Sequence, residues 1–262
     1  MHEFHFIAGL PRSGSTLLAA MLRQNPKFHA SMSSPVGSIF KAMQNAVSRG
    51  HESAMFLTDE QRERLLRSCF DECYRGYPEE VIFDNNRVWT SKMAVLAKLY
   101  PDCTMLCRVR DPVCIVDSIE RLTRKNPLEL SGIFGFNAGG TVYDRVRKLL
   151  ADDGMVGFAL NGLKEALYGE ENARIMVVDY DTLTMFPEVT LKAIYEFVGH
   201  KWYPHHDFDN LEQIPLAGEF DERIGTPGLH TIGHSVKMNK RPTILPPDIV
   251  NNIAKPFWSV KA

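Results

Sequence analysis

Four short apolar runs have the length and composition of buried β-strands, and they span 4–9, 80–84, 103–110 and 173–180. Apolar residues recur at helical spacing elsewhere, which predicts helices at about 14–26, 37–49, 58–75, 91–99, 111–122, 141–151, 155–168 and 181–198, and a short one after 246–248. The segments 27–36, 126–140 and 200–245 show little periodicity and are predicted to be loops. Strands that alternate with helices predict an α/β fold with a central, mostly parallel sheet flanked by helices.

Three polar segments follow the first three predicted strands. They run from Gly9 to Thr16, from Asp84 to Lys92 and from Arg110 to Ser118. The carboxyl ends of parallel strands meet at one edge of a sheet, and ligands of such folds bind there. We therefore expect these segments to form one site.

The stretch 9-GLPRSGSTLL-18 departs from a phosphate-binding P-loop at one position. The P-loop pattern requires Gly, four residues, Gly, Lys and then Ser or Thr. The glycines and the threonine are in register, but Ser15 stands where the lysine belongs. Backbone N–H groups of a tight turn at a helix start favour an anion, and Arg12 adds a cation. The pattern predicts a P-loop-like three-layer fold with an anion site in this turn.

Composition narrows the classes of function. The chain has 262 residues, of which 44% are hydrophobic, and a net charge of −2. This suits a single domain over 1–262, with helical and loop insertions at about 27–78 and 126–170. The near-neutral charge offers no basic field for nucleic acid, and no apolar run is long enough for a transmembrane helix. Five cysteines without disulfide-type spacing, and a start without a signal-peptide pattern, predict reduced thiols and a cytoplasmic location.

The run PRSGSTLL resembles the 5′-phosphosulfate loop of sulfotransferases, which use 3′-phosphoadenosine 5′-phosphosulfate (PAPS) as sulfuryl donor. The PRSGST form is similar to that of tyrosylprotein sulfotransferases and of small bacterial sulfotransferases. A second signature of the family is an arginine at the end of a strand and a serine eight residues later, which bind the 3′-phosphate. Arg110 and Ser118 have this spacing, about two helical turns apart. The segments 178–199 and 227–250 are also similar to the family, so the resemblance covers most of the chain.

The resemblance implies a set of donor-binding residues. They are Pro11, Arg12, Ser13, Gly14, Ser15, Thr16, Arg110, Ser118, Lys240 and Arg241. The last two belong, with Lys237, to a basic cluster in the segment that would close over the nucleotide; a solvated basic loop is the alternative. A sulfuryl group carries less charge than a terminal phosphoryl group, so its transfer needs no bridging metal ion.

The residue that would take the proton of the acceptor departs from the family pattern. Ser33 stands where tyrosylprotein sulfotransferases have a catalytic glutamate, and the segment after the second predicted strand lacks the histidine of cytosolic sulfotransferases. Asp84 is the nearest group able to act as a base, with His29 as a second candidate. Arg87 or Lys92 would face the sulfuryl oxygens. The predicted catalytic residues are Arg12, Asp84 and Arg87.

The predicted reaction is an in-line transfer of a sulfuryl group from PAPS to a hydroxyl of a peptide tyrosine, a sugar or a small metabolite. An ATP–Mg²⁺-dependent kinase with an atypical P-loop remains open; Asp84 or Asp111 would then hold the metal, although Asp111 also suits a helix cap. A non-catalytic nucleotide-binding protein also remains open. Neither Cys69 and Cys73 nor the segment 205–207 has the further ligands of a metal site. An oligomer is compatible with the sequence.

Overall fold

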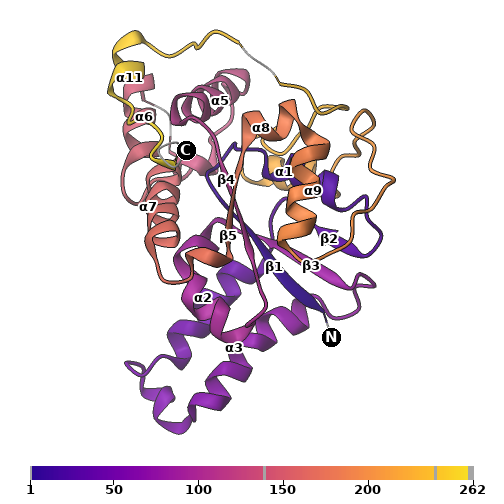
Figure 1. Cartoon of the computed structure of the whole chain (residues 1–262). Helices are drawn as coiled ribbons and strands as arrows, with labels where there is room; N and C mark the ends of the chain where they lie inside the picture. The colour runs from indigo at the N-terminus through magenta and orange to yellow at the C-terminus, as the bar shows by residue number, and fades with distance from the viewer. Residues whose placement is uncertain (1, 138–139, 239–240, 259–262) are drawn as a thin grey trace.

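A computed structural model describes residues 2–137, 140–238 and 241–258, and in this part of the chain five strands form one sheet (Figure 1). The strand order is β2-β3-β1-β4-β5, and every neighbouring pair is parallel. The strands are β1 (Glu3–Gly9), β2 (Phe28–Ala30), β3 (Val81–Asn85), β4 (Met105–Val109) and β5 (Ile175–Asp179). The predicted α/β class is confirmed, and the sheet is parallel throughout.

Helices connect the strands and cover the sheet (Figure 1). The α-helices are α1 (Ser15–Leu22), α2 (Val36–Val47), α3 (Asp59–Cys73), α4 (Met93–Leu99), α5 (Pro112–Lys125), α6 (Val142–Leu150), α7 (Met155–Tyr168), α8 (Tyr180–Met185), α9 (Pro187–Phe197), α10 (Ala217–Arg223) and α11 (Pro247–Asn252). Short 3₁₀ segments are η1 (Glu52–Phe56), η2 (Arg87–Lys92), η3 (Gly132–Phe134) and η4 (Asn172–Arg174). The glycine-rich turn lies between β1 and α1, as predicted.

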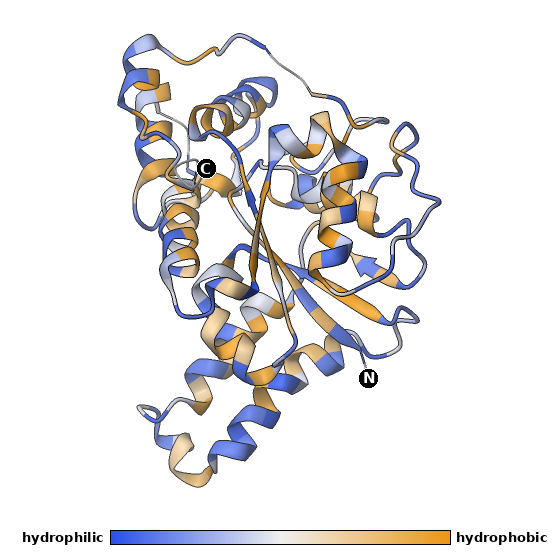
Figure 2. Ribbon diagram, viewed as in Figure 1, coloured by the Kyte–Doolittle hydropathy of each residue, from blue (hydrophilic) through white to orange (hydrophobic). Residues whose placement is uncertain are grey.

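Two apolar clusters pack against the two faces of the sheet. On β1, Phe6 belongs to the cluster shared with α2 to α7 and α11, whereas Ile7 belongs to the cluster shared with α1, α8 and α9. Cys107 and Leu106 on β4 divide in the same way, because successive side chains of a strand point to opposite faces. A parallel sheet needs both faces covered, and the strands are correspondingly apolar (Figure 2). The result is the expected three-layer arrangement.

Three elements differ from the predictions. Strand β2 lies in a segment predicted to be irregular, since three residues at a sheet edge are too few to show a period. The predicted helix 181–198 is two helices, because Pro187 lacks the N–H group needed to continue α8 and instead starts α9. Helix α10 lies inside the predicted loop 200–245 and is only seven residues long.

The start of α5 follows the sequence signal. The Asp111 carboxylate accepts a hydrogen bond from the N–H of Val113 at 2.7 Å, and Pro112 occupies the first turn. The cap uses the side chain that was also a candidate metal ligand. Asp111 therefore serves the helix end and is not part of the cavity lining described below.

Within the described ranges, no helix combines the length and apolarity needed to cross a bilayer. All five cysteines are free thiols, as predicted. Burial raises the pKa of Cys107, on β4, to about 12. A thiol with a raised pKa is a poor nucleophile, and Cys107 packs in the apolar core. The predicted cytoplasmic location stays a prediction.

Candidate active site

A cavity of about 810 Å³ lies at the carboxyl ends of the strands, where the polar segments were expected to meet. Its lining comes from the carboxyl ends of the strands and the segments that follow them, from 132–136, from Met155 at the start of α7 and from 220–238. In the part of the chain that the structure describes, this lining contains four arginines, one lysine and no aspartate or glutamate. A concave site with this balance of charge favours an anionic ligand.

The turn between β1 and α1 presents backbone N–H groups to this cavity. Gly14 caps α1 with a left-handed φ of 86°, and no side chain satisfies the first N–H groups of the helix. Ser15 and Thr16, in the first turn of α1, line the cavity. The Ser13 hydroxyl is buried and donates to the carbonyl of Leu10, which holds the turn in shape. N–H groups at a helix start, together with the helix dipole, favour an anion, and the anion site in this turn stays a prediction.

Arg12 joins three parts of the site. Its Nε donates to Ser118 Oγ on α5 at 3.1 Å, and its guanidinium also donates to the carbonyl of Leu229. Burial, and then the neighbouring Arg110, lower the pKa of Arg12 below its usual value. The Arg12 backbone is left-handed, with φ of 56°, which is uncommon outside glycine. The turn thus holds a strained, partly desolvated cation at the cavity.

Arg110 lies beside Arg12, as the sequence suggested. One guanidinium nitrogen donates to the carbonyl of Arg12 at 3.1 Å, and the guanidinium carbon lies 4.1 Å from the centre of the Tyr180 ring. Its Nε is buried without a hydrogen-bond partner among the described residues. Ser118 reaches Arg12 but is not itself in the cavity lining. The two predicted 3′-phosphate residues are therefore linked through Arg12.

Arg108 is a cavity residue that the sequence reasoning missed. Its side chain is 2% exposed, lines the cavity from β4, and has two nitrogens without a partner in the described ranges. Burial lowers its pKa to about 9. A buried cation without a counter-charge is costly unless a ligand completes it. The sequence did contain a signal for this residue, because Arg108 is a charged residue inside the predicted strand 103–110.

Asp84 does not line the cavity. It is fully buried, and its carboxylate accepts hydrogen bonds from Ser34 Oγ at 2.8 Å, Tyr74 Oη at 2.7 Å and Trp89 Nε1 at 2.6 Å. Burial raises the pKa of Asp84, against the effect of these donors. Its predicted role as the base stays a prediction, and the three donors weigh against it. Ser33, which replaces the family glutamate, does line the cavity.

The other residues around β3 fall into two groups. Arg87 lines the cavity, and its side chain is accessible to solvent. Partial desolvation by the surrounding protein atoms lowers the pKa of its guanidinium. Lys92 instead donates to Gln44 Oε1 at 2.8 Å. His29 packs on the ring of Tyr77, 4.6 Å between ring centres, and is not in the cavity lining. Of these, Arg87 alone is placed to contact a ligand.

The segment that follows α10 brings a histidine–carboxylate pair to the cavity, and the sequence reasoning also missed it. The backbone N–H of His230 donates to Asp221 Oδ2 at 2.7 Å, and His230 Nδ1 lies 2.5 Å from Asp221 Oδ1. Asp221, on α10, is 1% exposed, whereas the imidazole lines the cavity. No sequence motif joins these residues, which are nine positions apart in a segment without periodicity.

The basic C-terminal segment returns to α5. Asp117 Oδ1 accepts hydrogen bonds from Thr243 Oγ1 at 3.0 Å and from the N–H of Ile244 at 2.7 Å. Arg241, one of the predicted nucleotide contacts, lies 3.8 Å from Asp117 Oδ2. Lys240 lies outside the described residues. The segment therefore packs beside the helix that carries Ser118, close to the predicted 3′-phosphate residues.

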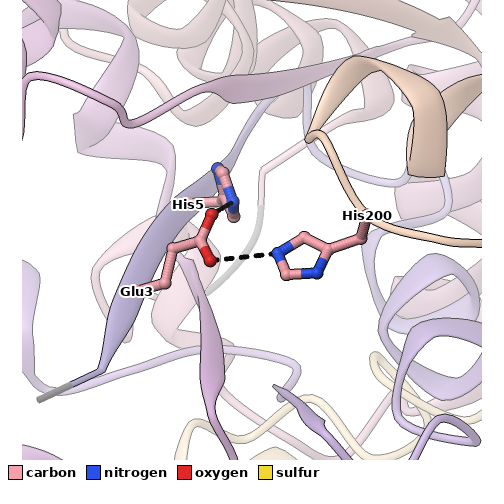
Figure 3. Close-up of side chains that lie close together, drawn as sticks. All are labelled: Glu3, His5 and His200. Carbon is pink, nitrogen blue, oxygen red and sulfur yellow. Dashed lines mark hydrogen bonds and ion pairs between the residues drawn. The ribbon is translucent and has the colours of Figure 1, made fainter.

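The His and acidic side chains that come closest to a metal-ligand arrangement, among the residues the structure describes, are Glu3, His5 and His200 (Figure 3). The Glu3 carboxylate contacts His5 Nε2 at 2.9 Å and His200 Nε2 at 3.0 Å. The N–H of Thr104 donates to His5 Nδ1, so the proton of His5 sits on Nε2 and serves the carboxylate. Glu3 and His5 lie at the start of β1, at the end of the sheet opposite the cavity. The hydrogen bonds of Glu3 to the two histidines account for the arrangement without a metal ion.

The parallel sheet, the lysine-free turn and the arginines beside it define a P-loop-like protein with a site for a ligand that carries more than one anionic group. The profile of the sulfotransferase family matches residues 5–204. The chain belongs to the sulfotransferase family.

Two curated relatives are protein-tyrosine sulfotransferases. The chain is 26% identical over 216 residues to protein-tyrosine sulfotransferase 2 of Gallus gallus, which covers 77% of this chain and 53% of the relative. It is 24% identical over 223 residues to protein-tyrosine sulfotransferase 1 of Danio rerio, with 81% and 57% covered. The chain thus spans about half the length of these relatives.

Among solved structures, the fold is similar to a sulfotransferase domain from the curacin biosynthetic pathway. The TM-score is 0.60 at 14% identity, and 96% of each chain is covered. A sulfotransferase from Alicyclobacillus acidocaldarius gives a TM-score of 0.50 at 15% identity, over 84% of this chain and 89% of that one. These likenesses confirm the predicted fold class.

Proposed function

We propose that this protein transfers a sulfuryl group from PAPS to an acceptor hydroxyl by in-line displacement. The observation that carries the proposal is the cavity lining, in which four arginines and the N–H groups of a helix start meet without any described carboxylate. Arg108 and Arg110 keep buried nitrogens without partners, which suits a ligand with several anionic groups. The donor, when bound, supplies the sulfuryl group.

Each residue of the site has a proposed task. Pro11 to Thr16 hold the 5′-phosphosulfate, and Arg12 stabilises the charge that develops on the departing oxygen. Arg110 and Ser118 bind the 3′-phosphate, and Arg241 and Lys240 of the C-terminal segment contact the nucleotide. The other two arginines of the lining, Arg87 and Arg108, bind the sulfuryl oxygens.

The same lining weighs against a kinase. Transfer from ATP requires a carboxylate for Mg²⁺, but Asp84 is engaged by three donors and Asp111 caps α5. The comparison that separates the two functions is thermal unfolding of the protein with 3′-phosphoadenosine 5′-phosphate (PAP) or with ATP–Mg²⁺. A ligand that binds only the folded state raises the midpoint, and at 100 times its Kd the gain is about 2.7 kcal/mol. We expect stabilisation by PAP alone; stabilisation by ATP–Mg²⁺ alone would overturn the proposal.

Replacing Arg108 separates donor binding from stability. The change Arg108→Met keeps an unbranched apolar side chain and removes a desolvated charge, so we expect the ligand-free protein to unfold at a higher temperature. The affinity for PAPS is expected to fall about tenfold or more, since a charged hydrogen bond contributes about 1.5–3 kcal/mol. Isothermal titration and thermal unfolding measure the two effects. A variant that loses stability and keeps its affinity would show that Arg108 only supports the sheet.

The acceptor is proposed to be an aromatic alcohol such as a peptide tyrosine. Phe136 and Phe220 line the cavity and are 56% and 37% exposed, so they offer apolar surface to a ring. Transfer from labelled PAPS to a tyrosyl peptide, a sugar and an aliphatic alcohol ranks the acceptor classes. If the protein binds PAP but transfers no sulfuryl group to any of these acceptors, it would be a non-catalytic nucleotide-binding protein.

A further inference from the structure

We propose that His230 is the general base of the sulfuryl transfer and that Asp221 positions it, an inference that rests on the proposed function. The family glutamate is replaced by Ser33, and the nearest carboxylate on β3 points away from the cavity into the core. A base for the acceptor proton must lie within hydrogen-bond reach of the reacting groups. His230 lines the cavity, and its Nε2 has no hydrogen-bond partner in the part of the chain that the structure describes.

The backbone places His230 next to the proposed phosphosulfate loop. The guanidinium of Arg12 donates to the carbonyl of Leu229, the residue directly before His230. The same guanidinium reaches Ser118, so one side chain ties the loop, α5 and the histidine segment together. Arg12 and His230 both line the cavity.

Asp221 fixes the ring and its tautomer. Its carboxylate contacts both the backbone N–H and Nδ1 of His230, at 2.7 Å and 2.5 Å. The proton on Nδ1 is thereby held by Asp221, and Nε2, which has no hydrogen-bond partner among the described residues, is left as an acceptor. The ring of Phe220 packs edge-on at 5.4 Å and limits its rotation. This is the arrangement of a base held by a third group.

The charges around the ring keep it ready to accept a proton. Burial lowers the pKa of His230, and Arg12 from the β1–α1 turn and Arg87 from η2 lower it further, whereas Asp221 from α10 acts in the opposite direction. His230 is therefore neutral at pH 7, as a base must be. Activity should rise with pH through a pKa below the usual value of about 6.5.

The proton of the acceptor hydroxyl passes to His230 Nε2 while the acceptor oxygen bonds to the sulfur of PAPS. The bond between sulfur and the 5′-phosphate oxygen breaks, and its electron pair leaves with PAP. Arg12, in the loop proposed to hold the 5′-phosphosulfate, would stabilise the charge on that oxygen, and His230 would release its proton to water after product dissociation.

The experiment compares His230→Gln with wild type on two phenols. N-Acetyltyrosine amide keeps its proton near neutral pH, whereas 4-nitrophenol is already largely ionised at pH 8 and needs no base. We expect transfer to the tyrosine amide to fall about 10²–10⁴-fold and transfer to 4-nitrophenol to change far less. Where the wild type uses neither phenol, sulfate release from PAPS to water replaces the first measurement, and the same loss is expected.

Two further readouts exclude a merely structural effect. PAP should stabilise His230→Gln against unfolding as much as it stabilises wild type. If PAP does not bind wild type, the result contradicts the proposed function itself, separately from the assignment of the base. In Asp221→Asn, NMR titration of ¹³C-labelled histidine should show the pKa of His230 moved to lower pH, and the acid limb of the rate profile should move with it. His200→Gln is the matched control, because His200 also pairs with a carboxylate, Glu3, away from the cavity. Equal loss with both phenols, or an unchanged rate in His230→Gln, would overturn the proposal.

Discussion

The variant Arg12→Ala is expected to lose turnover by about 10²–10³-fold or more, the effect of removing one donor that stabilises charge in the transition state. Arg12 is also the side chain that links Ser118 to the carbonyl of Leu229. Its removal therefore deprives the reaction of a cation and loosens the placement of His230. Initial rates with labelled PAPS, at a saturating concentration of acceptor, measure the loss.

Two companion variants separate charge from geometry and from strain. Arg12→Lys keeps the charge, but a single ammonium lacks the planar fork that serves Ser118 and Leu229 together, so only part of the rate should return. Arg12→Gly relieves the left-handed backbone at φ 56° and should raise the free energy of unfolding by about 1 kcal/mol over Arg12→Ala. Arg12→Gly is expected to be as inactive as Arg12→Ala, because both remove the cation. A fully active Arg12→Lys would mean that the contacts of the guanidinium fork are dispensable.

The variant Gly9→Ala is expected to destabilise the fold by about 3 kcal/mol or more. Gly9 has a φ of 106°, and a Cβ there would lie 2.3 Å from the carbonyl oxygen and 2.6 Å from the nitrogen of Arg108. Both contacts are to backbone that pairs β1 with β4, and the N–H of Leu10 donates to the same oxygen at 2.8 Å. Neither strand can move without breaking the ladder that holds the anion turn. Urea unfolding, with the midpoint and slope compared, measures the loss.

Other glycines provide the controls for this prediction. Gly76 has a φ of 88° but open space around its Cβ position, so Gly76→Ala isolates the backbone strain, of about 1–2 kcal/mol. Gly218, in α10, has neither positive φ nor near neighbours, and Gly218→Ala should be neutral or stabilising. A Gly9→Ala variant no less stable than Gly76→Ala would show that the two strands yield to the methyl group.

The elements with a long or strongly bounded pattern could be predicted from sequence. The capping residue Asp111 and the proline after it place the start of α5, and the strand–turn–helix around Arg12 follows from local apolar spacing. Strand β2 and helix α10 could not be predicted, because a short element is defined by its partners rather than by a period of its own. Because α10 could not be predicted, neither could the position of Asp221, the proposed positioning residue.

The side chains of the site also fall into those that a local sequence pattern predicts and those that it does not. Arg12, Arg110 and Ser118 belong to motifs with fixed spacing, and the structure brings them together. Asp84 has the right chemistry and the right strand end, but strand alternation turns it toward Tyr74 and Trp89 in the core. A polar residue at a strand end has two faces available, and local sequence does not say which one carries the site.

The sequence by itself determined the fold class, the anion turn and the family, because each depends on short-range spacing: apolar runs, two glycines and an arginine–serine pair. Only the tertiary structure decided which charges face the cavity. It buried Asp84, left two buried nitrogens of the cavity residue Arg108 without a hydrogen-bond partner among the described residues, and set His230 on Asp221 beside Arg12. These pairings join residues on different elements, and their energies depend on burial and distance that no local pattern of residues contains.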